Sequence, residues 1–170
     1  MFPLPKSCTS TSATSIYLNC KEIIRNKGYK YDRAQVDSAY HNIMQSMHPD
    51  KCSKMPQDLK DLANSYASFV STAYNVITND IKRAEYLLKN NFNLDVNEYK
   101  PDQQMLIKYY TMNEQIEDGD KSVLTQVKNE YVILLKQISE AFEANNGVDA
   151  LKLLCHIKMC KSILLKYSNN

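Results

Sequence analysis

The chain has 170 residues, 44% of them hydrophobic, and a formal net charge of +2 at neutral pH. This length holds one compact domain or two small ones, and so small a charge excludes nucleic acid or an anionic membrane as the main partner. Only three glycines and five prolines interrupt the sequence, and no apolar run approaches the roughly 20 residues of a membrane span, so we expect a soluble, all-α protein.

The first fourteen residues are rich in serine and threonine, and no acidic residue precedes Glu22. A mitochondrial presequence has this composition, but it is usually also rich in arginine, which the segment lacks. Residues 1–14 therefore fit either a targeting segment or a flexible polar terminus, and both interpretations stay open. The first would place the protein in the matrix of a mitochondrion or a mitochondrion-derived organelle; the cytoplasm is the alternative.

Apolar residues recur with helical spacing in four segments of the first half, at 16–26, 32–47, 57–78 and 81–90. Asp32 is the expected N-cap of the second segment. Pro49 removes a backbone donor and disfavours helical geometry at the residue before it, so this helix should stop there. Two apolar stripes joined by a short loop predict an antiparallel helical hairpin. The stripes consist of Val36, Tyr40, Ile43 and Met47 in one helix and of Leu59, Leu62, Tyr66, Phe69, Ala73 and Val76 in the other.

Three more helical patterns follow an asparagine-rich segment at 91–100, which we interpret as a linker between two domains. Gly119 and Gly147 lie where the later connections must turn. Three amphipathic helices of this kind bury one another in a three-helix bundle, so we predict an N-terminal domain at 15–90 and a C-terminal bundle at 101–170. The helices and their expected core residues are 102–117 with Met105, Tyr109, Met112 and Ile116; 121–144 with Leu124, Val127, Tyr131, Leu134, Ile138 and Ala141; and 148–167 with Ala150, Leu153, Ile157, Cys160, Leu164 and Tyr167.

One motif stands in the loop of the predicted hairpin, where His48-Pro49-Asp50 is followed by Lys51. This tripeptide at the tip of a helical hairpin, after a short first helix, is the arrangement of a J-domain. The chain also carries the string Arg-Ala-Glu-Tyr-Leu-Leu at 83–88. Over residues 15–167 it resembles the HscB-type J-proteins of iron–sulfur cluster assembly, in which such a string is a hallmark and a helical C-terminal domain follows.

The resemblance implies an L-shaped co-chaperone that is not an enzyme and needs no cofactor. Its J-domain would bind a DnaK-type heat-shock chaperone and stimulate ATP hydrolysis there through His48, Pro49, Asp50 and Lys51. Asp50 offers a carboxylate to a guanidinium, and Pro49 stiffens the loop so that docking costs less entropy. The alternative for His48 and Asp50 is that they merely cap the neighbouring helix ends.

The charge of the second helix departs from the family pattern. Many J-domains present several lysines or arginines on this helix to an acidic chaperone surface, whereas segment 32–47 has only Arg33 and the titratable His41. Electrostatic steering is therefore expected to be weak or displaced toward the loop. Basic residues occur instead at Lys51, Lys54, Lys82 and Arg83.

The helix at 102–117 holds more apolar residues than its core stripe requires. Leu106 and Tyr110, four residues apart, form a row, with Ile107 beside them and Glu114 next along. An apolar row bordered by an acid is typical of a helix that binds a partner. Five acidic residues against one lysine in residues 101–120 would suit a basic partner surface.

By resemblance, Leu106, Ile107, Tyr110 and Glu114 match the positions with which the family binds the IscU-type scaffold protein. Met159, on the last helix, falls where an aromatic residue is usual, and a flexible methionine fills a similar pocket. The alternative is that these apolar residues close against the N-terminal domain or widen the bundle core.

No metal or catalytic site is expected. The five cysteines form no CxxC pair, so we predict no zinc module. Cys160 shares the core stripe with Ile157 while His156 points elsewhere, which favours buried thiols over metal ligands around 155–160. The sequence has no glycine-rich phosphate loop, so the chain should not hydrolyse ATP itself.

Two other functions stay open. The chain would be a J-protein that serves a different client in general protein folding, or a structural helical adaptor in which His-Pro-Asp occurs by chance.

Overall fold

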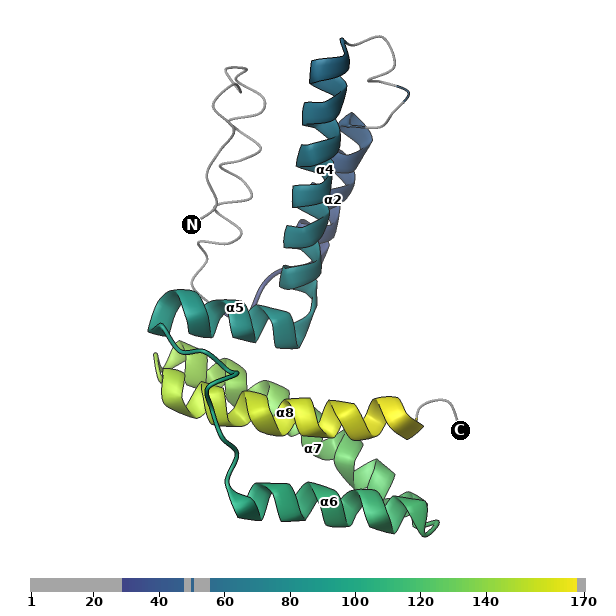
Figure 1. Ribbon diagram of the computed structural model, residues 1–170, viewed down its shortest axis with the longest axis vertical. Helices are drawn as coiled ribbons and strands as arrows, with labels where there is room; N and C mark the ends of the chain where they lie inside the picture. The colour runs from purple at the N-terminus through teal and green to yellow at the C-terminus, as the bar shows by residue number, and fades with distance from the viewer. Residues whose placement is uncertain (1–28, 48–49, 51–55, 168–170) are drawn as a thin grey trace. The chain divides into compact units, whose positions relative to one another are not determined.

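The computed structural model describes residues 29–47, 50 and 56–167, and its regular elements there are six α-helices (Figure 1). They are α2 (Arg33–Ser46), α4 (Gln57–Thr78), α5 (Asp80–Phe92), α6 (Gln103–Glu117), α7 (Lys121–Glu143) and α8 (Gly147–Tyr167). Each lies within two residues of its predicted bounds, so the prediction of an all-α protein is confirmed for this part of the chain. The helix expected at 16–26 and the segment 1–14 lie outside the described residues. Among the described helices, none combines the length and the apolarity that crossing a bilayer requires.

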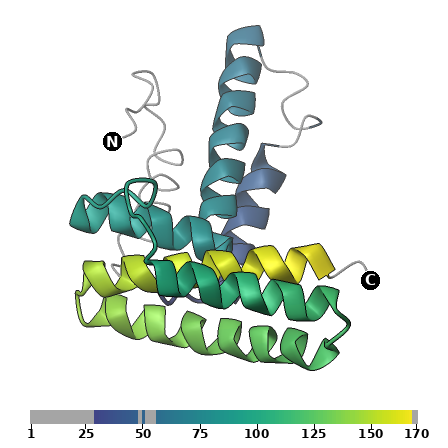
Figure 2. The same cartoon turned by 60° about the horizontal axis from the view of Figure 1, so that its bottom comes forward.

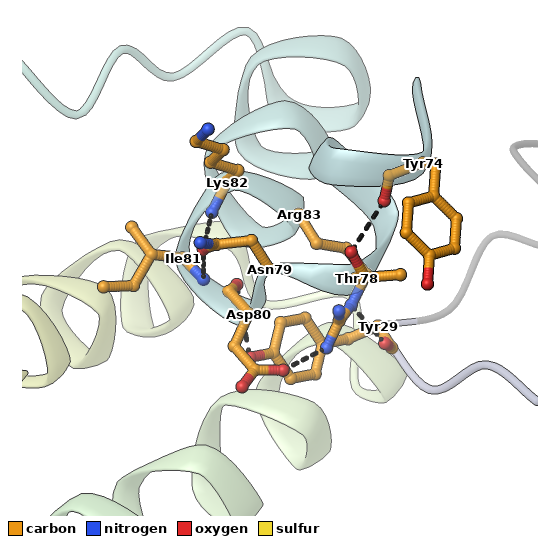
Figure 3. Close-up of polar contacts among 8 residues, drawn as sticks. All are labelled: Tyr29, Tyr74, Thr78, Asn79, Asp80, Ile81, Lys82 and Arg83. Carbon is orange, nitrogen blue, oxygen red and sulfur yellow. Dashed lines mark hydrogen bonds and ion pairs between the residues drawn. The ribbon is translucent and has the colours of Figure 1, made fainter. Parts of the chain in front are cut away.

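Side-chain caps explain where several helices begin. Asp32 accepts a hydrogen bond from the backbone N–H of Gln35 at 3.2 Å, as the sequence predicts. Asn79 accepts from the N–H groups of Ile81 and Lys82, both at 3.1 Å (Figure 3). Asp102 and Asp120 cap α6 and α7 in the same way. Each cap satisfies a helical donor that otherwise lacks a partner, so the helix starts at a defined residue.

The chain divides into two compact units, and residues 31–78 belong to the first. Here α2 and α4 pack against each other as a hairpin (Figure 1). Arg33 contacts Tyr74 and, further along α2, Tyr40 contacts Ser71, so the two helices run antiparallel as predicted. In the described part of this hairpin the buried apolar residues are Val36, Ile43 and Val70.

Leu59 corrects the predicted stripe of α4, because its side chain is 49% exposed. The antiparallel register places the first turn of α4 beyond Ser46, where α2 ends. A helix can bury an apolar residue only where another element covers it, so the spacing of the stripe alone was not sufficient to predict whether Leu59 is buried.

The second unit contains residues 28–30 and 79–170, and α6, α7 and α8 form the predicted bundle in it (Figure 2). Its core also includes the apolar face of α5, with Ala84, Leu87 and Leu88 at most 5% exposed. The sequence assigned α5 to the N-terminal domain, but α5 packs on α8. The expected linker at 91–100 likewise packs Phe92, Leu94, Val96 and Tyr99 against this core. The division into a functional N-terminal domain at 15–90 and a functional C-terminal domain at 101–170 stays a prediction, and so does the L shape.

Packing of α5 explains the string at 83–88. Arg83 is 8% exposed; its Nε donates to the carbonyl of Tyr29 at 2.9 Å, and Nη2 lies 2.7 Å from Oδ1 of Asp80 (Figure 3). Its guanidinium also lies 4.4 Å from the centre of the Tyr29 ring. Glu85 forms an ion pair with Lys158 of α8. The string therefore anchors α5 and the segment at Tyr29 to the bundle.

Two glycines serve the connections. Gly119 has φ of +98°, a left-handed conformation that glycine adopts without a steric penalty, in the turn between α6 and α7. Gly147 is buried at the start of α8, where an added Cβ would lie 2.9 Å from Cβ of Phe92 and closer still to its ring. Gly119 is therefore needed for its backbone conformation, whereas Gly147 is needed because a side chain there would collide with Phe92.

Candidate partner-binding surfaces

The loop between α2 and α4 holds the first predicted site. Asp50 is exposed, which suits a carboxylate that a partner would reach. His48, Pro49 and Lys51 lie outside the described residues, so their roles stay predictions. The hairpin expected around this motif is present, with α2 ending at Ser46 and α4 beginning at Gln57.

Arg33, the arginine of α2, is bound within the contact between the two helices of the hairpin. Nε of Arg33 donates to the Asp37 carboxylate at 2.9 Å, and Nη2 donates to the Tyr74 hydroxyl at 3.2 Å. The Tyr74 hydroxyl in turn donates to Asp37 at 2.9 Å, and the rings of Tyr74 and Tyr40 stack with centres 4.0 Å apart. Hydrogen bonds from Arg33 and Tyr74 lower the pKa of the Asp37 carboxyl. Because Asp37 neutralises Arg33, α2 presents even less positive charge to a partner than its sequence indicates.

The basic residues noted outside α2 differ in their surroundings. Lys82 is exposed at the start of α5. Arg83 is buried and bound to Asp80 and the Tyr29 carbonyl, so its charge serves the packing of α5. Its position in the sequence could not reveal this, because burial depends on how α5 packs. Lys51 and Lys54 lie outside the described residues.

The second predicted site lies on α6, where three large apolar side chains are exposed. Leu106 is 47% exposed, Ile107 55% and Tyr110 65%, and we call these three the α6 row. The alternative that they widen the bundle core is excluded, since Met105 and Tyr109 are the buried residues of the helix. Glu114 is exposed one turn beyond Tyr110, and its carboxylate, hydrogen-bonded to the Tyr110 hydroxyl, raises the pKa of that tyrosine.

Met159 lies on the side of α8 that faces α6. His156, three residues earlier, contacts Tyr109, and Lys166, seven residues later, contacts Asn113 and Glu117 of α6. Residues spaced by three and seven share one face of a helix. Met159 is half-buried against the core, which leaves part of its side chain accessible beside α6.

The acidic residues of the α6 segment have different local roles. Asp102 and Asp120 accept hydrogen bonds from backbone N–H groups as helix caps. Glu117 forms an ion pair with Lys166 of α8. Glu114 instead lies next to the α6 row, where it is hydrogen-bonded to the Tyr110 hydroxyl.

A polar cluster that the spacing of residues did not predict lies around the hydroxyl of Tyr109, on the buried face of the helix that carries the α6 row. The hydroxyl of Tyr109 is 2.7 Å from Oε1 of Glu130 in α7 and 3.0 Å from Nδ1 of His156 in α8. Lys108 also donates to Glu130 at 2.7 Å, and Cys160 donates to the Tyr109 oxygen at 3.5 Å. We call these five residues the Tyr109 cluster. The expectation that His156 points away from the core residues was wrong, because its ring meets Tyr109.

The thiols near the end of the chain are buried, as predicted. Cys155 is 7% and Cys160 0% exposed, and both are free. Burial raises the pKa of each thiol, which keeps both protonated at neutral pH. Within the described residues, no group of three or more His, Cys, Asp or Glu side chains is arranged to hold a metal ion.

Comparison with known proteins finds HscB co-chaperones among the relatives of this chain. No protein-family model matches the chain. The iron–sulfur cluster co-chaperone protein HscB of Homo sapiens is 25% identical over 146 residues, which cover 81% of this chain and 62% of that protein. The HscB homologue of Arabidopsis thaliana is 28% identical over 150 residues, which cover 82% of this chain and 60% of that protein. The chain thus spans about three fifths of the length of these curated relatives.

A solved structure supports the same fold. The crystal structure of the human co-chaperone protein HscB superposes with a TM-score of 0.77 at 23% sequence identity, covering 88% of this chain and 80% of that one. The expected fold class is therefore confirmed.

Proposed function

This chain is related by sequence and by fold to the HscB-type co-chaperones of iron–sulfur cluster assembly, and from that premise we propose that it is a J-protein with two binding surfaces. The hairpin loop stimulates the ATPase of a DnaK-type chaperone. The α6 row binds an IscU-type scaffold. The chain thereby delivers the scaffold to the chaperone, and it performs no chemistry of its own.

Exposure of the α6 row is the observation that carries the proposal for the scaffold. Three large apolar side chains lie together on one helix and remain 47–65% exposed. Burying them on binding would contribute about 25 cal/mol for each Å² of apolar surface removed from water. Glu114 at the end of the row favours a partner that places a basic group there.

The proposal for the chaperone rests on Asp50 and the hairpin that carries it. Asp50 is exposed in the connection between the two packed helices. Arg33 is bound to Asp37 and Tyr74, so we infer that steering comes from the loop rather than from α2. The compartment, a mitochondrion or related organelle or the cytoplasm, stays a prediction from the N-terminal composition.

The decisive measurement is the steady-state ATPase rate of a DnaK-type chaperone with and without this chain and an IscU-type scaffold. We expect stimulation by the wild-type chain and none by the His48→Gln variant. A double variant, Leu106→Ala with Tyr110→Ala, should stimulate normally without scaffold. It should bind the scaffold at least about tenfold more weakly in calorimetry, because central apolar side chains dominate interface energies.

A matched control separates the α6 row from general surface effects. Val132 and Ile133 of α7 are 66% and 57% exposed, so their double alanine variant removes similar apolar area elsewhere on the bundle. This control should retain full scaffold binding. Unchanged stimulation by His48→Gln would favour a structural adaptor, and stimulation without any scaffold binding would favour a J-protein with a different client.

A further inference from the structure

The Tyr109 cluster joins all three helices of the bundle at one phenolic oxygen. Tyr109 belongs to α6, Glu130 to α7, and His156 and Cys160 to α8. Tyr109 is 4% exposed and Cys160 0% exposed, so the centre of the cluster is shielded from water. Lys108 closes the cluster on the solvent side through Glu130.

Hydrogen-bond chemistry assigns the protons of this cluster. A phenol has one proton to donate, and the 2.7 Å contact with a carboxylate oxygen is where that proton is best placed. The Tyr109 oxygen then accepts from its other neighbours, the Cys160 thiol and Nδ1–H of His156. His156 therefore carries a proton on Nδ1, and burial, which lowers the pKa of its ring, keeps it neutral at neutral pH.

Few buried side chains attach α6 to the bundle, and its last turns are also held by Lys166 of α8, which contacts Asn113 and Glu117. Met105 and Tyr109 are its buried residues, and Met112 and Ile116 are only half-buried. Tyr109 lies between Ile107 and Tyr110 in the sequence, on the turn that presents the α6 row. A shift of the Tyr109 hydroxyl would therefore move the row itself.

We propose that the Tyr109 cluster is a proton-sensitive clamp that holds α6, and with it the α6 row, in one position on the bundle. This inference rests on the proposed function in that the row is the scaffold-binding surface. Tyr109, Glu130 and His156 are positioning residues, since they act on the partner through α6 rather than by touching it.

Charge around His156 sets the direction of the response. On α6 it faces Lys108, Tyr109 and, more remotely, Asp102; on α7 it faces Glu130. Burial and the Lys108 ammonium lower the pKa of His156, although Glu130 opposes them. Protonation would bring a second cation next to Lys108 in a partly desolvated site, so mild acid loosens the clamp. Partial burial would raise the pKa of Glu130, but hydrogen bonds from Lys108 and Tyr109 keep it lowered, so Glu130 stays ionised throughout this range.

Three variants of the full chain test the clamp. Tyr109→Phe removes the central hydroxyl and keeps the ring. His156→Asn keeps a side-chain donor near the position of Nδ1 but cannot titrate. Tyr131→Phe is the matched control, because Tyr131 is a half-buried tyrosine of the same bundle that lies outside the cluster.

The first readout uses the free chain and needs no partner. Backbone amide and His156 ring signals are followed by NMR from about pH 7.5 to about pH 5.5, across the ordinary titration range of histidine. In the wild type, amide signals of α6 should shift together with the His156 ring. In His156→Asn the α6 shifts should disappear, and in Tyr131→Phe they should persist.

The second readout is binding of an IscU-type scaffold at both ends of this pH range. Tyr109→Phe should bind about tenfold more weakly at the higher pH, and Tyr131→Phe within about twofold of the wild type. On acidification the wild type should lose more affinity than His156→Asn, a comparison that cancels any titration of the scaffold.

The outcomes distinguish this inference from the proposed function. If α6 titrates with His156 but the wild type binds no scaffold, the proposed function is wrong and the clamp on α6 stands. If the scaffold binds but α6 signals ignore His156, or Tyr109→Phe binds as tightly as the wild type, the clamp is refuted. Should Tyr109→Phe fail to fold, the His156→Asn comparison decides alone.

Discussion

The α2–α4 hairpin and the C-terminal bundle are both helical, but they are held together by different interactions. Among the described residues of the hairpin, three apolar side chains are buried, and a stack of Tyr40 on Tyr74 with hydrogen bonds to Asp37 completes its seam. The bundle and α5 share a continuous apolar core around Ile138, Leu154 and Ile157. The described part of the hairpin therefore combines a few buried apolar residues with polar contacts at the seam, whereas the bundle encloses a polar cluster within its apolar core.

This difference matters for the two candidate sites. The predicted chaperone-binding loop is carried by the hairpin, while the α6 row is carried by the helix that the Tyr109 cluster attaches to the bundle. We therefore expect the two regions to respond differently to core substitution, to acid and to loss of a surface hydroxyl.

Truncation of a core side chain should give the largest effect and should stay within its own unit. Leu154 is 0% exposed in the bundle, and Leu154→Ala should cost about 3 kcal/mol of its unfolding free energy through lost burial and a cavity. Val70→Ala in the hairpin should cost about 2 kcal/mol. Native-state hydrogen exchange measures both, amide by amide. Equal loss of protection in both units after either change would show that they unfold as one.

Acidification should destabilise the bundle before the hairpin, by less than the core truncation. Because the pKa of His156 is lowered on folding, the unfolded chain binds more protons below about pH 6.5, and the stability of the bundle falls there. The lowered pKa of Asp37 instead adds stability to the hairpin that is kept above the usual aspartate pKa and lost at more acidic pH. Urea unfolding at several pH values, with His156→Asn as the reference, measures the first effect. A slope that survives in this variant would assign it to another group.

Loss of the Tyr74 hydroxyl should give the smallest effect. Tyr74→Phe keeps the stack on Tyr40 but removes the exposed hydrogen bond with Arg33 and the part-buried one with Asp37. Exposed charged contacts contribute little, so exchange of hairpin amides should rise by less than about fivefold. The change should be reproduced in the wild type by high salt, which screens the Arg33–Asp37 pair. A large effect would mean that the polar seam, and not the apolar core, holds the hairpin.

Local signals in the sequence were sufficient to predict the helices and the exposed row. Asp32 and Asp102 cap their helices as such residues do in isolated peptides, and Leu106 and Tyr110 fall outside the core stripe by spacing alone. These features depend on neighbours within a few residues, which the sequence states directly.

The partners of each helical face were decided by the tertiary structure. Leu151, Leu154 and Cys155 of α8 lie off its predicted stripe, yet they are buried because other helices, α5 among them, pack against α8. Arg83 is buried for the same reason, and Tyr109 meets His156 although 47 residues separate them. Periodicity shows that a face is apolar but not what covers it, because packing depends on residues that are distant in sequence.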